Sequence, residues 1–244
     1  MNLTKEGWLE CAGLTQDEIP DLLILEGTWW HKERYEMRLA YLDNVRELKF
    51  PDMYLGGYKG KKIMFCCAYG AARAVEPVHA FGSMGTKCVI QIGSCGGLQE
   101  GIVTGDILLS ECAKIGEGAS QYYGKTDYSK STPALLKQSQ SSFEARGFKV
   151  HRGLHLTTSA LFAQPPGRVE NWKRKGYLGV DMETSAVFSA AAFFGMTCAS
   201  FLFVWDELLN ERTWLDTFSP EETKRQQEAN KAIFEVALEL AFFE

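Results

Sequence analysis

Apolar runs of strand length alternate with amphipathic segments of helical length along most of this chain. Continuous apolar runs bounded by glycine or polar residues are typical of buried strands, and apolar residues three and four positions apart are typical of helices. Strands are predicted at 21–25, 52–60, 61–70, 88–92, 106–110, 148–159 and 198–205. Helices are predicted at 28–42, 70–81, 133–146, 169–175, 183–194 and 220–243. Residues 1–20 are polar and mixed and predict no element.

This alternation is typical of a sheet that is covered by helices and carries its binding loops at the strand ends. We therefore expect an α/β fold of three layers, with a central mixed, largely parallel twisted sheet flanked by helices. A chain of 244 residues is long enough to bury one large core. No linker, repeat or low-complexity segment divides it, so we expect a single domain over residues 1–244.

Charge and composition argue against several classes of function. The 26 basic residues stand against 31 acidic ones, a balance that favours neither nucleic acid nor an anionic membrane as partner. The seven cysteines are odd in number and lack C-x-x-C spacing, which predicts reduced thiols. The first residues lack the pattern of a signal peptide, and no apolar segment approaches the ~20 residues that a membrane span needs. We expect a cytoplasmic protein.

The segment KCVIQIGSCGG, residues 87–97, predicts a buried strand that breaks at Gly93 into a glycine-rich turn. Glycines let the backbone turn tightly and approach a ligand closely. Ser94 and the exposed N–H groups of such a turn can donate hydrogen bonds to an anion. Turns of this kind are also frequent for purely structural reasons. Two segments further along the chain strengthen the interpretation of this turn as a binding site.

Two carboxyl groups beside apolar segments further along the chain are candidates for catalysis. Glu183 lies in GVDMETSAVF, at the predicted start of an Ala-rich helix, where a rigidly held carboxylate can accept both hydroxyls of a ribose. The alternative is a carboxylate that only complements the helix dipole. Asp206 follows the apolar run 200–205, so partial burial should raise its pKa toward that of a general acid. The alternative for Asp206 is an ordinary cap of the next segment.

Several motifs in a fixed order relate these segments to a known family. They are NVR at 44–46, GGYKGKKI at 56–63, IGSCGGLQEGIVTGDILL at 92–109, SALF at 159–162 and GYLGVDMETSAVF at 176–188. From about residue 21 to its C-terminus the chain resembles the nucleoside phosphorylases of the hexameric bacterial purine nucleoside phosphorylase and uridine phosphorylase type. The adenosine-type nucleosidases are related to that family. The number and order of the motifs make the resemblance more specific than any single motif.

The resemblance implies a site for a nucleoside and for inorganic phosphate as co-substrate, with no cofactor and no metal. Its implied nucleoside residues are Met182 and Glu183 at the ribose, Phe162 packed on the base, and Asp206 as the acid beside the imidazole edge of a purine. Its implied phosphate residues are Gly27, Gln91, Gly93, Ser94 and Arg46 of a neighbouring subunit. Shared sites imply a homodimer or a hexamer that is a trimer of dimers.

Two positions depart from the phosphate-binding pattern of this family. Gln91 stands where the phosphorylases have an arginine before the glycine loop, and His31 stands where their first phosphate loop, G-D-P-x-R, ends in arginine. Each charge-assisted hydrogen bond contributes roughly 1.5 to 3 kcal/mol, so the two losses weaken phosphate binding by on the order of 10² to 10⁴. Arg73 and a protonated His31 are the candidates that compensate.

The implied base pocket carries signals of two kinds. Uridine-specific relatives follow the aromatic residue with a loop that carries glutamine and arginine, and here Gln164 and Arg168 follow Phe162 at imperfect spacing. Asp206 favours a purine, because pyrimidine members generally lack a carboxylate there. The arginine that assists this acid in purine enzymes has no clear match, and the candidates are Arg212, Lys224 and Arg225.

Three functions agree with these observations. The first is a nucleoside phosphorylase, with purine favoured over uridine, that produces the free base and ribose 1-phosphate. The second is a nucleosidase that uses water, favoured by Gln91 and His31 and by Glu26 as a candidate base at the end of the first strand. The third is a nucleoside-binding protein without catalysis.

Overall fold

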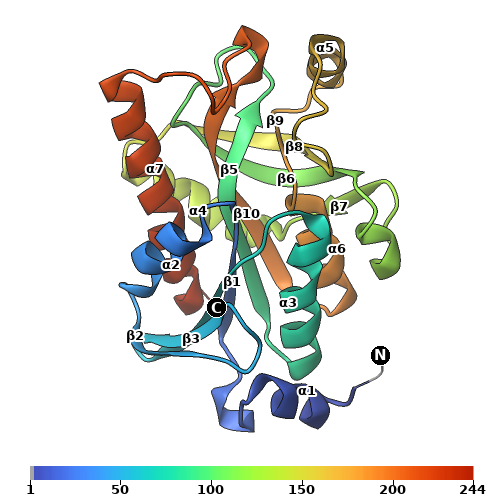
Figure 1. The fold of residues 1–244 in the computed structure, drawn as a ribbon, viewed down its shortest axis with the longest axis vertical. Helices are drawn as coiled ribbons and strands as arrows, with labels where there is room; N and C mark the ends of the chain where they lie inside the picture. Colours follow the sequence, from blue (N-terminus) through green and yellow to red (C-terminus); the bar gives the residue numbers. More distant parts are fainter. Residues whose placement is uncertain (1–2, 244) are drawn as a thin grey trace.

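The structure is a computed structural model that describes residues 3–243 and consists of a twisted sheet with helices on both faces (Figure 1). The strands are β1 (Leu22–Gly27), β2 (Asp43–Glu47), β3 (Met53–Tyr58), β4 (Lys61–Cys67), β5 (Cys88–Gly97), β6 (Ile107–Gly116), β7 (Tyr128–Lys130), β8 (Val150–Thr158), β9 (Gly179–Asp181) and β10 (Thr197–Glu207). The α-helices are α1 (Lys5–Ala12), α2 (His31–Leu39), α3 (Ala71–Met84), α4 (Pro133–Ala145), α5 (Pro166–Arg174), α6 (Thr184–Phe193) and α7 (Pro220–Glu239). No helix within residues 3–243 is long and apolar enough to cross a membrane.

The centre of the sheet is parallel, and the remaining strands combine parallel and antiparallel pairs. β1 pairs in parallel with β4 on one side and with β5 on the other, and β5 pairs in parallel with β10. Antiparallel pairs add β3 and β2 beyond β4, while β6, β8 and β9 connect β10 back to β5. The predicted α/β class with a mixed sheet flanked by helices is confirmed, although antiparallel pairing takes a larger share than we expected.

Each central strand divides its side chains between two cores. In β1, Leu23 and Leu25 pack with α1, α3 and α6, whereas Leu22 and Ile24 pack with α4 and α7 on the opposite face. Figure 1 shows α3 and α6 on one side of the sheet and α7 on the other. Because both faces are covered, these strands are continuous apolar runs in the sequence rather than alternating ones.

The N-terminal segment forms a helix that the sequence did not predict. α1 begins after Thr4, whose hydroxyl accepts a hydrogen bond from the backbone N–H of Gly7 at 3.2 Å. It ends at Gly13, which has a left-handed φ of 71°. The helix buries only Leu9 and Ala12, so its sequence has too short an apolar stripe to stand out.

The strand that begins at Cys88 does not break at Gly93, so the predicted glycine-rich turn is wrong. β5 continues to Gly97 and stays paired with β10, and none of its three glycines has a positive φ. These glycines instead allow neighbouring segments to pack closely against β5. A Cβ at Gly96 would lie 2.6 Å from Cδ1 of Leu208, and a Cβ at Gly93 would lie 3.1 Å from the carbonyl oxygen of residue 27.

A buried ion pair connects the end of β1 to α2 and α7. Glu26 is 1% exposed, and Arg38 beside it is fully buried. Arg38 donates from Nε to Oε2 of Glu26 at 2.9 Å and from Nη2 to Oε1 at 3.0 Å, and Nη2 also donates to Oδ1 of Asn230 at 2.6 Å. The guanidinium lies 5.1 Å from the centroid of the Phe234 ring. Bidentate geometry and a further acceptor allow two charges to remain out of water.

Removal of Arg38 should destabilise the fold strongly. Arg38→Met leaves the buried Glu26 with Arg34 as its remaining cationic partner, and we expect the free energy of unfolding to fall by about 3 kcal/mol. Urea unfolding followed by tryptophan fluorescence measures the change. The control Arg146→Met removes an exposed ion pair with Glu239 and should cost no more than about 1 kcal/mol. Equal losses in the two variants would contradict the structural role of the buried pair.

Candidate functional site

A cavity lies where the carboxyl ends of β1, β5 and β10 meet. The parallel register aligns these ends, because Gly27 is paired with Gly93 and Asp206 with Gly96. The turn from β9 into α6 adds a further wall, since β9 pairs with β5 at Gly96 and Gly97. Strand ends of this kind are where open α/β sheets bind ligands. Of the predicted site residues, the cavity is lined by Gly27, Gly93, Ser94, Met182, Glu183 and Asp206.

Glu183 is the N-cap residue of α6, and its carboxyl group is buried. It is 4% exposed, and the backbone N–H of Gly70 donates to its Oε1 at 2.6 Å. The other oxygen lies against Gly27, where any Cβ would collide with the carboxyl group. Burial, and then the charge of Asp181, raises the pKa of Glu183 to about 8. This group therefore holds its proton at neutral pH.

Asp181 keeps its negative charge beside Glu183. Burial alone would raise its pKa, but His155 and Thr184 outweigh burial and hold the pKa below its usual value. Nε2 of His155 lies 3.2 Å from Oδ1 of Asp181, and the Thr157 hydroxyl donates to the same oxygen at 2.9 Å. The backbone N–H of Thr184 donates to Oδ2 at 2.9 Å. Neither Asp181 nor His155 was predicted as part of a site.

Asp206 lies at a bulge in β10, where the pairing with β5 shifts between Val204 and Asp206. A bulge sends neighbouring side chains in new directions, and here both Trp205 and Asp206 line the cavity. Burial raises the pKa of Asp206 to about 7, although a hydrogen bond with the backbone of Trp214 lowers it. Its Oδ1 is buried and has no hydrogen-bond partner within the described residues. Such a carboxyl group can give a proton to a ligand near neutral pH.

Gln91 does not line the cavity, in contrast to its predicted place among the phosphate-binding residues. It is fully buried in β5, and its Oε1 accepts hydrogen bonds from the hydroxyls of Thr184 and Ser200. Thr184 is the first residue of α6 and also donates to Asp181. Gln91 therefore fixes the start of the helix that carries Glu183, from inside the protein.

The predicted base-binding loop is only partly brought to the cavity. Phe162 is 77% exposed and contacts Trp29 with ring centroids 5.7 Å apart, while its neighbour Leu161 lines the cavity. Gln164 lies in a separate depression beside the short 3₁₀ helix that follows β10. Arg168 is exposed and donates to a carbonyl of its own loop. The two polar residues suggested by uridine-specific relatives are therefore not in the cavity.

None of the cations predicted to bind phosphate lines the cavity within residues 3–243. His31 is exposed on α2, and Arg73 is paired with an acidic residue of its own helix. Arg46 on β2 pairs with Glu18 at 2.7 Å, and its role in a neighbouring subunit stays a prediction. The basic side chain that does line the cavity is Arg34, three residues beyond His31 on α2.

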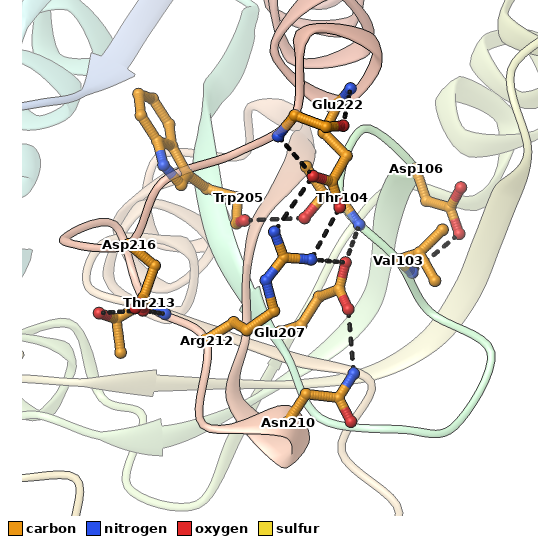
Figure 2. A network of polar contacts seen from close by, with 11 residues as sticks. Val103, Thr104, Asp106, Trp205, Glu207, Asn210, Arg212, Thr213, Asp216 and Glu222 are labelled. Atoms are coloured by element: carbon orange, nitrogen blue, oxygen red, sulfur yellow. Dashed lines mark hydrogen bonds and ion pairs between the residues drawn. The ribbon is translucent and has the colours of Figure 1, made fainter.

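The arginines considered as helpers of the acid are also placed elsewhere. Figure 2 shows Arg212 between Glu222 and Glu207. Its Nη1 donates to Oε1 of Glu222 at 2.7 Å and lies 3.6 Å from Oε1 of Glu207. Lys224 and Arg225 are exposed on α7. Arg212 thus anchors the loop after β10 to the start of α7 and is not among the residues that line the cavity.

Four tryptophans gather at the cavity, and the sequence reasoning missed them. Trp29 and Trp30 follow β1, Trp205 lies in β10, and Trp214 lies in the loop before α7. Trp30 stacks on Trp205 with centroids 5.6 Å apart and an interplanar angle of 6°, and Trp214 meets Trp29 edge-on at 5.8 Å. The available signal was the placement of three tryptophans at the carboxyl ends of two predicted strands.

These groups suit a small ligand that has a planar ring and hydroxyl groups. Indole and phenol rings offer stacking surfaces, and buried carboxyl groups with a pKa near neutrality exchange protons and accept hydrogen bonds. Within residues 3–243, no group of three His, Cys, Asp or Glu side chains is arranged to hold a metal ion. The fold and the cavity thus define an α/β protein with a small-molecule site at its strand ends.

Comparison with known proteins identifies the family. The chain belongs to the phosphorylase superfamily, whose sequence pattern matches residues 33–241. It is 26% identical to the DeoD-type purine nucleoside phosphorylase of Alkaliphilus metalliredigens (strain QYMF) over 237 residues, which cover 94% of this chain and 97% of that protein. It is 30% identical to the DeoD-type purine nucleoside phosphorylase of Geobacillus kaustophilus (strain HTA426) over 195 residues, which cover 77% and 78%.

A solved structure agrees with this assignment. The crystal structure of uridine phosphorylase from Vibrio fischeri ES114 complexed with 6-hydroxy-1-naphthoic acid superposes with a TM-score of 0.79 at 25% sequence identity, covering 93% of both chains. The family predicted from the sequence motifs is confirmed.

The buried carboxyl group of Glu183 should make stability depend on pH. Its pKa of about 8 in the folded state lies above the ordinary value of 4.5, so its protonation stabilises the fold at low pH. That contribution is lost as the pH rises toward 8. Glu183→Gln imitates the protonated form, so it should match the wild type near pH 4.5. At pH 8 it should be more stable by on the order of 2–4 kcal/mol.

Urea unfolding at the two pH values measures this difference. The control Glu228→Gln changes an exposed carboxylate of α7 and should give no gain that grows with pH. A Glu183→Gln variant that is less stable than the wild type at pH 8 would mean that the ionised carboxylate stabilises the empty cavity.

Proposed function

We propose that this protein cleaves the N-glycosidic bond of a purine nucleoside with inorganic phosphate, to give the free base and ribose 1-phosphate. The observation that supports this most is the pair of carboxyl groups on the wall of one cavity. Asp206 has a pKa of about 7 and Glu183 a pKa of about 8. Both groups therefore change protonation where a cell works, which is what acid catalysis near neutral pH needs.

Cleavage creates two charges, and each carboxyl group neutralises or stabilises one of them. The departing base gains electrons and needs a proton, and the sugar ring becomes positively charged. Asp206 gives its proton to the base as the C–N bond breaks. Glu183, with Met182 beside it, holds the ribose hydroxyls, and the positive sugar favours the ionised form of this carboxyl group. Phosphate, held near Gly27 and Ser94, forms the new bond to the anomeric carbon.

A purine is favoured over uridine by two observations. Asp206 brings a protonated oxygen to the cavity, and Gln164 and Arg168, the residues suggested by uridine-specific relatives, lie outside it. The sequence relatives are named purine nucleoside phosphorylases, whereas the solved structure is a uridine phosphorylase. A homodimer or hexamer with shared sites and a cytoplasmic location stay predictions from the sequence.

Hydrolysis by water is the second candidate. It is favoured by the burial of Gln91 behind the cavity and by the exposure of His31, because both positions then supply no charge to a phosphate. Glu26 is poorly suited to serve as the base in that reaction. Arg38 donates to both of its carboxylate oxygens, and Nε of Arg34 lies 3.1 Å from Oε1, so these oxygens are already engaged by two cations.

Base release with and without phosphate distinguishes the candidates. Adenosine, inosine and uridine are incubated with the protein, and the free base is measured by chromatography. We expect purine release that requires phosphate, together with formation of ribose 1-phosphate. Equal release without phosphate would support the nucleosidase, and nucleoside binding without any release would support a protein that only binds.

Asp206→Asn should slow purine nucleosides by about 10²- to 10⁴-fold, because the amide cannot protonate the base. A riboside with a nitrophenyl leaving group needs no proton on departure, so its cleavage should be largely spared. The ratio of kcat/KM for the two substrates, in wild type and variant, measures the effect. Equal losses on both substrates would reduce Asp206 to a structural role.

A further inference from the structure

Arg34 is a basic side chain at the cavity to which the sequence assigned no role. It lies on α2, is 9% exposed, and lines the cavity together with Gly27 and Ser94. Its Nε lies 3.1 Å from Oε1 of Glu26. Within residues 3–243 the guanidinium makes no hydrogen bond and has no other ion pair, so its remaining N–H donors are available to a ligand.

The ionic cluster around Glu26 carries one positive charge in excess. Arg38 already matches the single negative charge of Glu26 with two hydrogen bonds and binds Asn230 as well. Arg34 is thus a second guanidinium on a carboxylate that is already paired. An uncompensated charge that is nearly withdrawn from water is costly, and an anion that enters the cavity would remove this cost.

Among the other acidic groups of the cavity, Asp181 is ionised, and its two oxygens already accept hydrogen bonds from Thr157 and Thr184. Asp181 faces His155 at 3.2 Å. Glu183 and Asp206 have raised pKa values of about 8 and about 7, so they carry little or only partial charge near neutral pH. Arg34 is the single basic side chain among the described residues of the cavity wall, so it is the side-chain cation there that a phosphate can contact.

We propose that Arg34, braced by Glu26, is the cation that binds inorganic phosphate in this chain, in place of the arginines that are absent at His31 and Gln91. The inference rests on the proposed function for the role of phosphate as co-substrate. Positions 31 and 34 lie three residues apart, on the same face of α2. Arg34 thus places a charge at the cavity from one turn further along the helix. A planar guanidinium whose Nε lies beside a carboxylate can present its other N–H groups as a fork, which suits the oxygens of a phosphate.

Titration with inorganic phosphate in the absence of nucleoside tests the inference directly. Isothermal titration calorimetry compares the wild type, Arg34→Gln and the control Arg146→Gln. The control removes an exposed arginine at the C-terminal end of α4. We expect phosphate to bind about 10- to 150-fold more weakly to Arg34→Gln, as for the loss of one charge-assisted hydrogen bond. The control should bind like the wild type. The KM for phosphate in base release should rise by a similar factor.

The variant should fold, because Glu26 keeps both hydrogen bonds of Arg38, and urea unfolding checks this. Arg34→Lys keeps a cation beside Glu26 without the planar fork, so its affinity should lie between those of the wild type and Arg34→Gln. This second variant tests the inference even if Arg34→Gln unfolds.

Two results would overturn the inference, and they differ in what they say of the proposed function. If Arg34→Gln binds phosphate as tightly as the wild type, another group supplies the charge and phosphorolysis still stands. If the folded wild type neither binds phosphate nor needs it for base release, the inference and phosphorolysis both fail. Phosphate binding that depends on Arg34, without cleavage of any nucleoside tested, would support the inference and contradict the proposed activity.

Discussion

The parallel register of β5 with its two neighbours is the constraint on which the site depends. β5 is paired with β1 on one side and β10 on the other, so three strand ends coincide. Side chains have to be small where these ends crowd together. Gly27 leaves room for the carboxyl group of Glu183, and Gly96 leaves room for Leu208. The glycines of this region therefore serve packing around a cavity rather than turning of the chain.

The surroundings of the buried carboxyl groups at this cavity differ in the charged groups that they place beside each one. Glu26 lies between two guanidinium groups, and Arg38 donates two charge-assisted hydrogen bonds that satisfy both of its buried oxygens. Asp206 has no such partner, and Glu183 has a negatively charged neighbour in Asp181, so burial dominates and both hold protons near neutrality. A buried carboxyl group thus forms an ion pair in one place and is a candidate acid in another. The difference lies in which charges are within reach.

Aromatic contacts hold the loops of the cavity together. Trp29 from the loop after β1 contacts Phe162 and Trp214, which come from the loops after β8 and β10. The last of these loops is anchored at its base by Arg212, Glu207 and Glu222 (Figure 2). A ligand with a planar ring would meet indole faces that are already in contact with one another. Its binding and the arrangement of these three loops are therefore coupled.

The amino-acid sequence by itself determined the α/β class and most of the central elements, because buried strands and amphipathic helices produce local periodicities that need no knowledge of distant residues. It also indicated Glu183, at the start of an Ala-rich helix, and Asp206, directly after an apolar strand. Tertiary structure alone decided which other side chains surround the cavity. Gln91 looked like part of an anion site but bonds to Thr184, 93 positions away, because strand register turned it toward α6. Arg34 lies at the cavity because α2 packs against β4, where Tyr35 contacts Phe65, and this contact joins segments that are not adjacent in the chain.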